Sequence, residues 1–379
     1  MSLTTRSARS LAAVALAAGL CLSTPAVGLA AAPAPASAVL VAPAKLAPVD
    51  LASRAEAFNA RHGLTDVRPA GQVIDPTQYQ CDADTDFRRW SADQVDRLSQ
   101  ADLDFLAETA ADALPTYDAL LFGSSSDQAY SLGQDSQVLT KTFKKLRAFW
   151  DINSSDIQLM GMNGHVYSDV ARMTEIYQVV FELDAVTAAA YAQYVHDYLA
   201  SSPTLDADNP LMTLNAFAYS TFGTDPAISD RIIMGAGILQ AYDELGYGDV
   251  APQLILAHEF GHHVQFELGM ITAETVGEAE TTRRTELHAD ASASYFATHP
   301  KGLSMQYKRV QQFLGVFYGI GDCGFTSGGH HGTPNQRRAA ADWGYRLQEA
   351  NRPKSYVHPA RTFAELFDRQ LPVLVAPDA

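Results

Sequence analysis

The stretch His258-Glu259-Phe260-Gly261-His262 has the form H-E-x-x-H and lies in an apolar run that predicts a helix. Residues i and i+4 share one face of a helix, so both imidazoles can point at one metal ion. Glu259 follows the first histidine and can reach a water at that ion. Two neutral histidines and a carboxylate base are the groups with which zinc hydrolases activate water. The alternative, a helix that only presents polar residues, leaves a carboxylate without a partner in an apolar segment.

A second polar segment, Glu286-Leu287-His288-Ala289-Asp290, follows 24 residues after His262. A catalytic zinc keeps three protein ligands and one open position, so a third ligand is required. Glu286 can supply it from a second helix. Asp290 lies one turn further on the same face, where its carboxylate can accept the free N–H of a ligand imidazole. The sequence therefore predicts a Zn²⁺ site made by His258, His262 and Glu286, with Asp290 behind it.

Neighbouring polar residues are not expected to bind the same metal. His263 lies about 100° round the helix from His262, which favours a position at the surface or beside the ligands. His288 faces away from Glu286 for the same reason. Three other acidic residues are alternative third ligands, but none begins an E-x-x-A-D pattern: Glu267, Glu278 and Glu280.

Three motifs resemble those of the bacterial neutral zinc metallopeptidases, a gluzincin-like family. They are H-E-x-G-H-H-x-Q at 258–265, E-L-x-A-D at 286–290 and H-G-[ST]-x-x-Q-R at 331–337. The match covers roughly residues 230–345, and Ala291 stands where such proteins often have cysteine. The competing metzincin pattern requires glycine and histidine at the positions of Gln265 and Leu268, so it fails. The resemblance implies a zincin-like fold and peptide-bond hydrolysis by a zinc-activated water.

The third motif places a histidine, His331, in the polar loop 327–332. Such loops carry functional residues in many proteins. Because amide hydrolysis passes through an oxyanion, the resemblance assigns His331 a catalytic role as a second donor to it. The alternative is that Thr333 caps a helix over 335–347 and His331 takes no part. Gln336 and Arg337 are expected to position that helix.

The first 38 residues have the composition of a secretory signal peptide and leader. Arg6 and Arg9 precede an apolar run from Leu11 to Leu22, and small residues at A-x-A spacing follow near 30–38. This run is too short to remain as a membrane span. Leu20 stands before Cys21 where a lipid-attachment motif requires Gly or Ala, which argues against lipid anchoring. We expect a secreted protein without stable membrane insertion.

Two cysteines, Cys81 and Cys323, remain after signal removal. In an exported protein they can form one disulfide between the N-terminal region and the loop after the metal helices. Two unpaired buried thiols are the alternative. No Cys or His lies at the spacing of a structural zinc cluster from either.

The chain carries a net charge of -16, and loss of Arg6 and Arg9 without any acidic residue brings it to -18. This acidic balance argues against nucleic acid as a partner. The expected partner is a protein or peptide substrate, and the sequence gives no oligomeric state.

The predicted fold class is α+β, with a mainly helical N-terminal region before a zincin-like domain that contains a small sheet. We divide the 379 residues into signal peptide and leader (1–38), irregular linker (39–90), helical region (91–205) and catalytic domain (206–379). One long helix is expected near 169–199, and strands near 211–222 and 231–239. Residues 232–237 suit an edge strand that receives a substrate backbone, or an ordinary half-buried strand.

The sequence therefore predicts a secreted zinc metallopeptidase with Glu259 as general base. Two alternatives stay open. One is a zinc-binding secreted interaction protein without hydrolytic activity, although such a protein has no need of a base at Glu259. The other is a zinc amidase that acts on a cell-wall amide.

Overall fold

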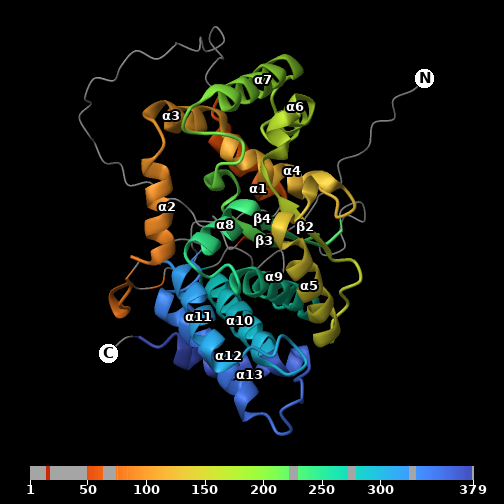
Figure 1. The fold of residues 1–379 in the computed structure, drawn as a ribbon, viewed down its shortest axis with the longest axis vertical. Helices are drawn as coiled ribbons and strands as arrows, with labels where there is room; N and C mark the ends of the chain where they lie inside the picture. Colours follow the sequence, from red (N-terminus) through yellow and green to blue (C-terminus); the bar gives the residue numbers. More distant parts are fainter. Residues whose placement is uncertain are drawn as a thin grey trace.

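The computed structural model describes residues 14–17, 49–62, 74, 76–82, 84–221, 229–271, 279–323 and 330–377. This part of the chain is mostly helical with one small sheet, which confirms the α+β class at that level (Figure 1). The predicted cleavage region near 30–38 and Cys21 lie outside the described residues. No described helix combines the length and the apolar character needed to cross a bilayer.

Five helices of the N-terminal half enclose one hydrophobic core and form one end of the molecule (Figure 1). They are α1 (Leu51–His62), α3 (Gln100–Thr109), α4 (Leu114–Leu121), α6 (Val170–Val179) and α7 (Ala185–Ser201).

Helix α1 lies in the segment 39–90 that we expected to be irregular, and that expectation is wrong there. Leu51 and Phe58 are buried in the core of the N-terminal half. Arg54 donates hydrogen bonds of 2.8 Å to the carbonyls of Phe181 and Glu182. These tertiary contacts hold a short helix whose sequence alone gave little helical signal.

The helix expected near 169–199 is two helices, α6 and α7. Between them Glu182 adopts a left-handed backbone conformation, with φ of 53°, which a continuous helix does not permit. The side chain of Asp184 then caps α7 by accepting the backbone N–H groups of Val186 and Thr187.

The sheet has the strand order β1-β3-β4-β2. Its strands are β1 (Val14–Ala17), β2 (Gln158–Met162), β3 (Ala216–Ser220) and β4 (Arg231–Gly235). Strand β4 pairs parallel with β2 and antiparallel with β3, and β1 pairs antiparallel with β3. Strand β1 falls in the predicted signal peptide, so cleavage of that peptide would leave β3 at the edge.

The structure contradicts two expectations about residues 231–239, namely the length of the strand and its place at the edge of the sheet. It ends at Gly235, where helix α8 (Ala236–Glu244) begins, so the strand expected at 231–239 is too long. Gly237 lies in the first turn of α8, and a Cβ there would come within 1.9 Å of the Pro210 carbonyl oxygen. Because β4 lies between β3 and β2, residues 232–237 do not form an edge strand.

The second half of the chain builds a larger core beside the sheet. Helix α9 (Ala251–Leu268) lies against β3 and helix α10 (Ala279–Thr298), and α10 lies against α12 (Pro334–Ala350). A Cβ at Gly261 would lie 2.5 Å from Ser292 Oγ, so glycine in the H-E-x-x-H segment allows α9 and α10 to approach closely. The same core contains side chains from α2 (Asp86–Asp96), α5 (Ser136–Phe149), α8, α11 (Tyr307–Gly319) and α13 (Ala360–Leu374).

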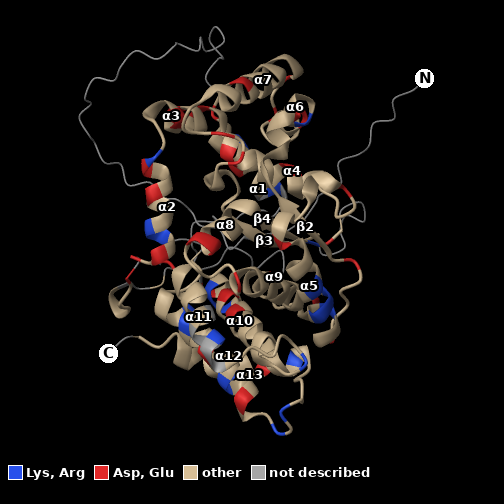
Figure 2. Ribbon diagram, in the orientation of Figure 1, with Lys and Arg blue, Asp and Glu red and all other residues tan. Residues whose placement is uncertain are grey.

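Helix α5 comes from the predicted helical region 91–205, yet Leu139, Leu146 and Phe149 are buried in the core that contains α9 and α10. Figure 2 shows basic residues gathered on this helix. Lys141, Lys144 and Arg147 are exposed, and the half-buried Lys145 donates to the Gly302 carbonyl at 2.8 Å. Six short 3-10 helices complete the described structure: η1 (Pro76–Gln78), η2 (Ala111–Ala113), η3 (Gln128–Tyr130), η4 (Gly133–Asp135), η5 (Gly164–Ser168) and η6 (Pro210–Thr213).

Candidate metal centre

Helices α9 and α10 bring His258, His262 and Glu286 together in the interior. Their relative exposures are 1%, 0% and 0%. The two imidazole Nε2 atoms are 3.2 Å apart. Each of them lies 3.3 Å from one carboxylate oxygen of Glu286. The two nitrogens and the two oxygens of the Glu286 carboxylate, from two helices, thus converge.

These separations are in the range expected of atoms that bind one metal ion. Zinc binds histidine nitrogen and carboxylate oxygen at about 2.0–2.2 Å, so neighbouring ligand atoms of a tetrahedron lie about 3.3–3.5 Å apart. The distances of 3.2 and 3.3 Å between the three groups are close to that edge. The chemistry of the donors, two imidazoles and a carboxylate, also suits zinc.

The groups behind the two histidines fix which ring nitrogen faces the cluster. His258 Nδ1 lies 2.9 Å from Asp290 Oδ1, and His262 Nδ1 lies 2.9 Å from Gln265 Oε1. Gln265 donates its amide N–H to the Thr285 carbonyl at 2.7 Å, which leaves Oε1 as the acceptor. When both rings are neutral and each Nδ1 carries the proton, the two Nε2 lone pairs face each other. A cation placed between the two Nε2 atoms could be coordinated by both lone pairs.

Asp290 also joins the third motif to the cluster. Arg337 on α12 donates to both oxygens of Asp290 at 2.7 Å and lies 3.3 Å from Glu286. The sequence predicted Asp290 behind a ligand, and the structure places it beside His258. We expected Arg337 only to position its helix, whereas here it balances two buried carboxylates.

Gln336 takes the structural role expected of it. It forms a capping box with Thr333 at the start of α12, since each residue's side chain accepts the other's backbone N–H. The helix cap by Thr333, which we considered as an alternative to a catalytic role of His331, is therefore present.

Glu259 is fully buried beside the cluster, and neither carboxylate oxygen makes a well-formed hydrogen bond to a described residue. Burial raises the pKa of Glu259 to about 8, although the charges of His258 and Arg337 oppose the shift. A carboxyl group with a pKa near neutrality can both accept and donate a proton at working pH.

The pKa shifts of the proposed ligand residues favour positive charge at the cluster. Burial acts to lower the pKa of His258, but the carboxylates of Asp290 and Glu286 outweigh it and raise that pKa to about 10. Burial acts to raise the pKa of Glu286, yet His262 and His331 bring it well below its ordinary value. A metal cation would supply this charge in place of a proton.

The charge of His331 acts to lower the pKa of Glu286, which links the third motif electrostatically to the cluster. The carboxylate of Asp322 orients it, because one oxygen accepts the His331 backbone N–H at 2.8 Å and lies 3.2 Å from Nδ1. The other oxygen of Asp322 lies 2.7 Å from His330 Nδ1. The sequence gave no sign of Asp322, because a single acidic residue in a loop has no periodic or motif context.

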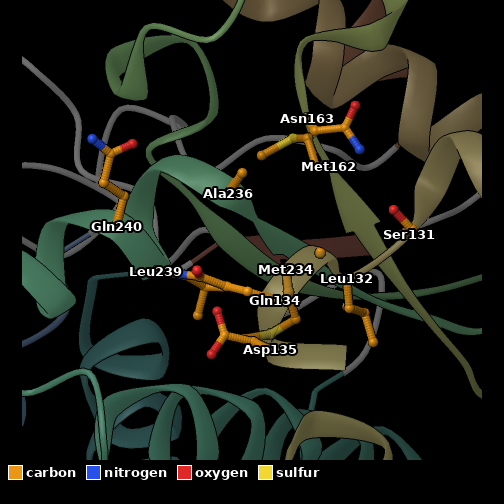
Figure 3. Close-up of a pocket in the computed structure, with 11 residues that line it drawn as sticks. Ser131, Leu132, Gln134, Asp135, Met162, Asn163, Met234, Ala236, Leu239 and Gln240 are labelled. Atoms are coloured by element: carbon orange, nitrogen blue, oxygen red, sulfur yellow. The ribbon is translucent and has the colours of Figure 1, made fainter. Parts of the chain in front are cut away.

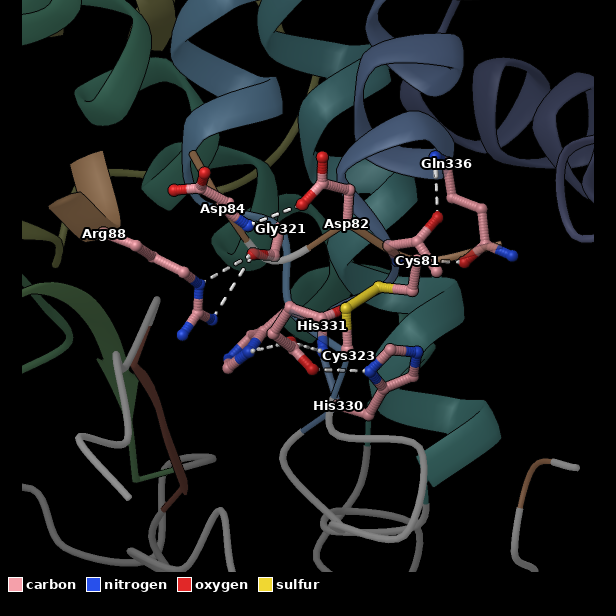
Figure 4. The surroundings of a disulfide bond; sticks show 11 residues. Cys81, Asp82, Asp84, Arg88, Gly321, Cys323, His330, His331 and Gln336 are labelled. Carbon is pink, nitrogen blue, oxygen red and sulfur yellow. Dashed lines mark hydrogen bonds and ion pairs between the residues drawn. A yellow bond between two sulfur atoms is a disulfide. The ribbon is translucent and has the colours of Figure 1, made fainter. Parts of the chain in front are cut away.

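A disulfide between Cys81 and Cys323 holds this segment, so the pairing expected from the sequence is present. Figure 4 shows His330 and His331 beside it, with Arg88 donating to the Gly321 carbonyl. The bond joins residues 242 positions apart. It therefore fixes the peptide next to Asp322 to the segment that precedes α2.

The structure also places the residues that were not expected to bind metal. His263 is buried rather than at the surface, and its Nε2 lies 3.0 Å from the Arg231 carbonyl. His288 points away from Glu286 and packs on Phe363 and Phe367 of α13. Among the described residues, neither Glu267 nor Glu280 joins the metal-binding group, and Glu278 lies outside them.

A cavity of about 420 Å³ lies apart from these residues, beside the carboxyl ends of β2 and β4 (Figure 3). None of the predicted catalytic or metal-binding residues lines it. The lining residues are Ser131, Leu132, Gly133, Gln134, Asp135, Met162, Asn163, Met234, Ala236, Leu239 and Gln240.

Comparison with known proteins gives no match. No family model, no curated protein and no solved structure matches this chain.

Proposed function

We propose that the protein is a secreted zinc metallopeptidase of zincin-like fold that hydrolyses peptide bonds. The observation that carries the proposal is the convergence of His258 Nε2, His262 Nε2 and the Glu286 carboxylate, at 3.2 and 3.3 Å from one another. The buried Glu259 beside them supplies the base that metal binding alone does not require.

His258, His262 and Glu286 would hold the metal, which when bound acidifies water and polarises the scissile carbonyl. Glu259 accepts the proton of the attacking water and delivers it to the leaving amine. His331, oriented by Asp322, donates a hydrogen bond to the oxyanion. Asp290 and Gln265 keep the two ligand imidazoles in the tautomer that leaves Nε2 free.

Export is part of the proposal. It is supported by the apolar segment after Arg6 and Arg9 and by the disulfide between Cys81 and Cys323, a bond that persists in oxidising compartments. The substrate would be a protein or peptide outside the cytoplasm.

A cell-wall amide remains a second candidate substrate, because the same groups would attack any amide carbonyl. A casein digestion assay and a peptidoglycan-release assay, run on wild type and Glu259→Gln, separate the candidates. The control is Glu267→Gln, which changes an exposed glutamate on the same helix.

Casein cleavage that survives Glu267→Gln and disappears in Glu259→Gln, with zinc retained, supports the peptidase. Release from peptidoglycan without casein cleavage would instead indicate a wall amidase. Zinc binding without either activity would indicate an interaction protein.

A further inference from the structure

Arg283 on α10 is a buried cation whose hydrogen-bonding capacity is largely unused. Its side chain is 3% exposed. Within the described structure, neither Nε nor Nη1 has a hydrogen-bond partner. Buried N–H groups are almost always satisfied, so two on one charged side chain point to a missing partner.

The contacts that Arg283 does make leave it undercompensated. Nη2 donates to Glu280 at 2.6 Å, but Glu280 is 47% exposed, so water screens this pair. The guanidinium also lies over the ring of Tyr79, 5.4 Å from its centroid. An anion placed on Nε or Nη1 would complete its charge and its hydrogen bonds.

The position of Arg283 connects it with the metal cluster. It precedes Glu286 by three residues on α10, so the two side chains lie on one face about one turn apart. Tyr79 packs in a small cluster with Cys81 and Cys323, the disulfide next to Asp322. The Arg283 side chain therefore joins the helix that supplies the third ligand to the cluster around the disulfide.

The other arginines near the cluster differ in this respect. Arg284, the next residue, donates to both oxygens of Asp368 at 2.8 and 2.9 Å. Arg337 donates to both oxygens of Asp290 and forms an ion pair with Glu286 at 3.3 Å. Arg284 thus provides a control of equal charge on the same helix.

We propose that Arg283 binds a carboxylate of the substrate and so selects for an acidic group close to the scissile bond. Three residues of helix rise about 4.5 Å, and an extended peptide advances about 3.3–3.6 Å per residue. The carboxylate would lie one or two residues from the cleaved bond. It can come from an acidic side chain or from the C-terminus of a peptide. This inference deepens the proposed peptidase function and rests on it.

The test uses three matched peptides of one sequence: internal Glu with an amidated C-terminus, internal Gln with a free C-terminus, and internal Gln with an amidated C-terminus. The kcat/KM of each is measured with wild type, Arg283→Gln and Arg284→Gln, all zinc-loaded. We expect one of the two carboxylate peptides to exceed the neutral peptide at least tenfold in wild type. The identity of that peptide names the source of the carboxylate. Arg284→Gln should keep this ratio, and Arg283→Gln should reduce it to within about threefold.

A ratio near one in wild type, or a ratio that survives Arg283→Gln, would overturn the inference while the peptidase function stands. Arg283→Lys covers the case in which Arg283→Gln does not fold, because it keeps the charge and loses the planar guanidinium. An intermediate ratio supports the inference, and an unchanged ratio opposes it.

A binding experiment tests the Arg283 site independently of peptidase activity. Calorimetry measures the binding of the same three peptides to zinc-loaded Glu259→Gln, with and without the additional change Arg283→Gln. Carboxylate-dependent binding that requires Arg283 would support the site even if no peptide is cleaved. Equal binding of all three peptides would overturn it.

Discussion

Asp322 holds His331 at two points, its backbone N–H at 2.8 Å and its Nδ1 at 3.2 Å. Burial acts to raise the pKa of Asp322, but the hydrogen bonds from His330 and His331 bring it well below its ordinary value. The carboxylate is therefore ionised at working pH and fixes the orientation of the His331 ring.

Asp322→Asn is expected to lower kcat about 10- to 100-fold with little change in KM, because the oxyanion donor loses its orientation. Zinc content should stay at the wild-type value. His331→Ala should lower kcat by a similar factor, and the double variant by no more than the larger single effect. Additive losses in the double variant would show that Asp322 acts independently of His331.

Removal of the disulfide is expected to weaken both stability and catalysis. Cys81→Ser with Cys323→Ser should lower the free energy of unfolding by about 2–5 kcal/mol, since the bond closes a long loop. The kcat should also fall, because Cys323 adjoins Asp322. Thermal unfolding and peptide hydrolysis measure the two effects. A fall in stability with unchanged kcat would separate the disulfide from the orientation of His331.

Asp290→Ala is expected to destabilise the protein by about 3–5 kcal/mol even when zinc is removed, because Arg337 would remain as a buried charge with one partner fewer. Its zinc affinity should also fall about 10- to 100-fold, as His258 loses its orienting partner. Unfolding in the presence of a chelator measures the loss of stability, and competition with a zinc indicator measures the loss of zinc affinity. Equal zinc affinity in the variant would contradict the orienting role.

Because the pKa of Glu259 is raised, we expect the free energy of unfolding of the zinc-free protein to depend on pH. Its pKa is raised from 4.5 to about 8, so the folded state holds this proton to higher pH than the unfolded state. The stabilisation is complete below about pH 4.5 and is lost as the pH rises towards 8. Each tenfold change in proton affinity is worth about 1.4 kcal/mol.

Glu259→Gln removes this titration. In the presence of a chelator, the free energy of unfolding of Glu259→Gln minus that of wild type should increase between pH 5 and pH 8. Bound zinc should make this difference smaller. Urea unfolding at several pH values checks this. A gap that does not vary with pH would show that Glu259 titrates normally.

The metal cluster was predictable because its residues lie at helical spacings. His258 and His262 share a face at i and i+4, and Asp290 follows Glu286 by one turn, so two short segments define four groups. The contribution of Arg337 was not predictable, because its pairing with Asp290 depends on how α12 packs on α10. Asp322 and Arg283 depend likewise on tertiary contacts with His331 and Tyr79.

The errors in the fold have the same origin. Apolar residues from 231 to 239 predict a strand, but periodicity cannot distinguish a buried strand from a strand followed directly by a buried helix. The interruption between α6 and α7 at Glu182 was not predicted, because no glycine or proline lies beside it in the sequence. Helix α1 is held by Arg54 and by buried Leu51 and Phe58, and its isolated sequence is too short to be helical by itself.

The most direct test of the central claim is the metal content of purified wild type, Glu286→Ala and the control Glu280→Ala, a partly exposed glutamate on the same helix. Elemental analysis is made on each protein together with its protease activity. We predict one zinc per chain in wild type and Glu280→Ala, and loss of both zinc and activity in Glu286→Ala. Full zinc occupancy in Glu286→Ala would contradict the site, because His258 and His262 would then bind the metal without the third ligand assigned to them.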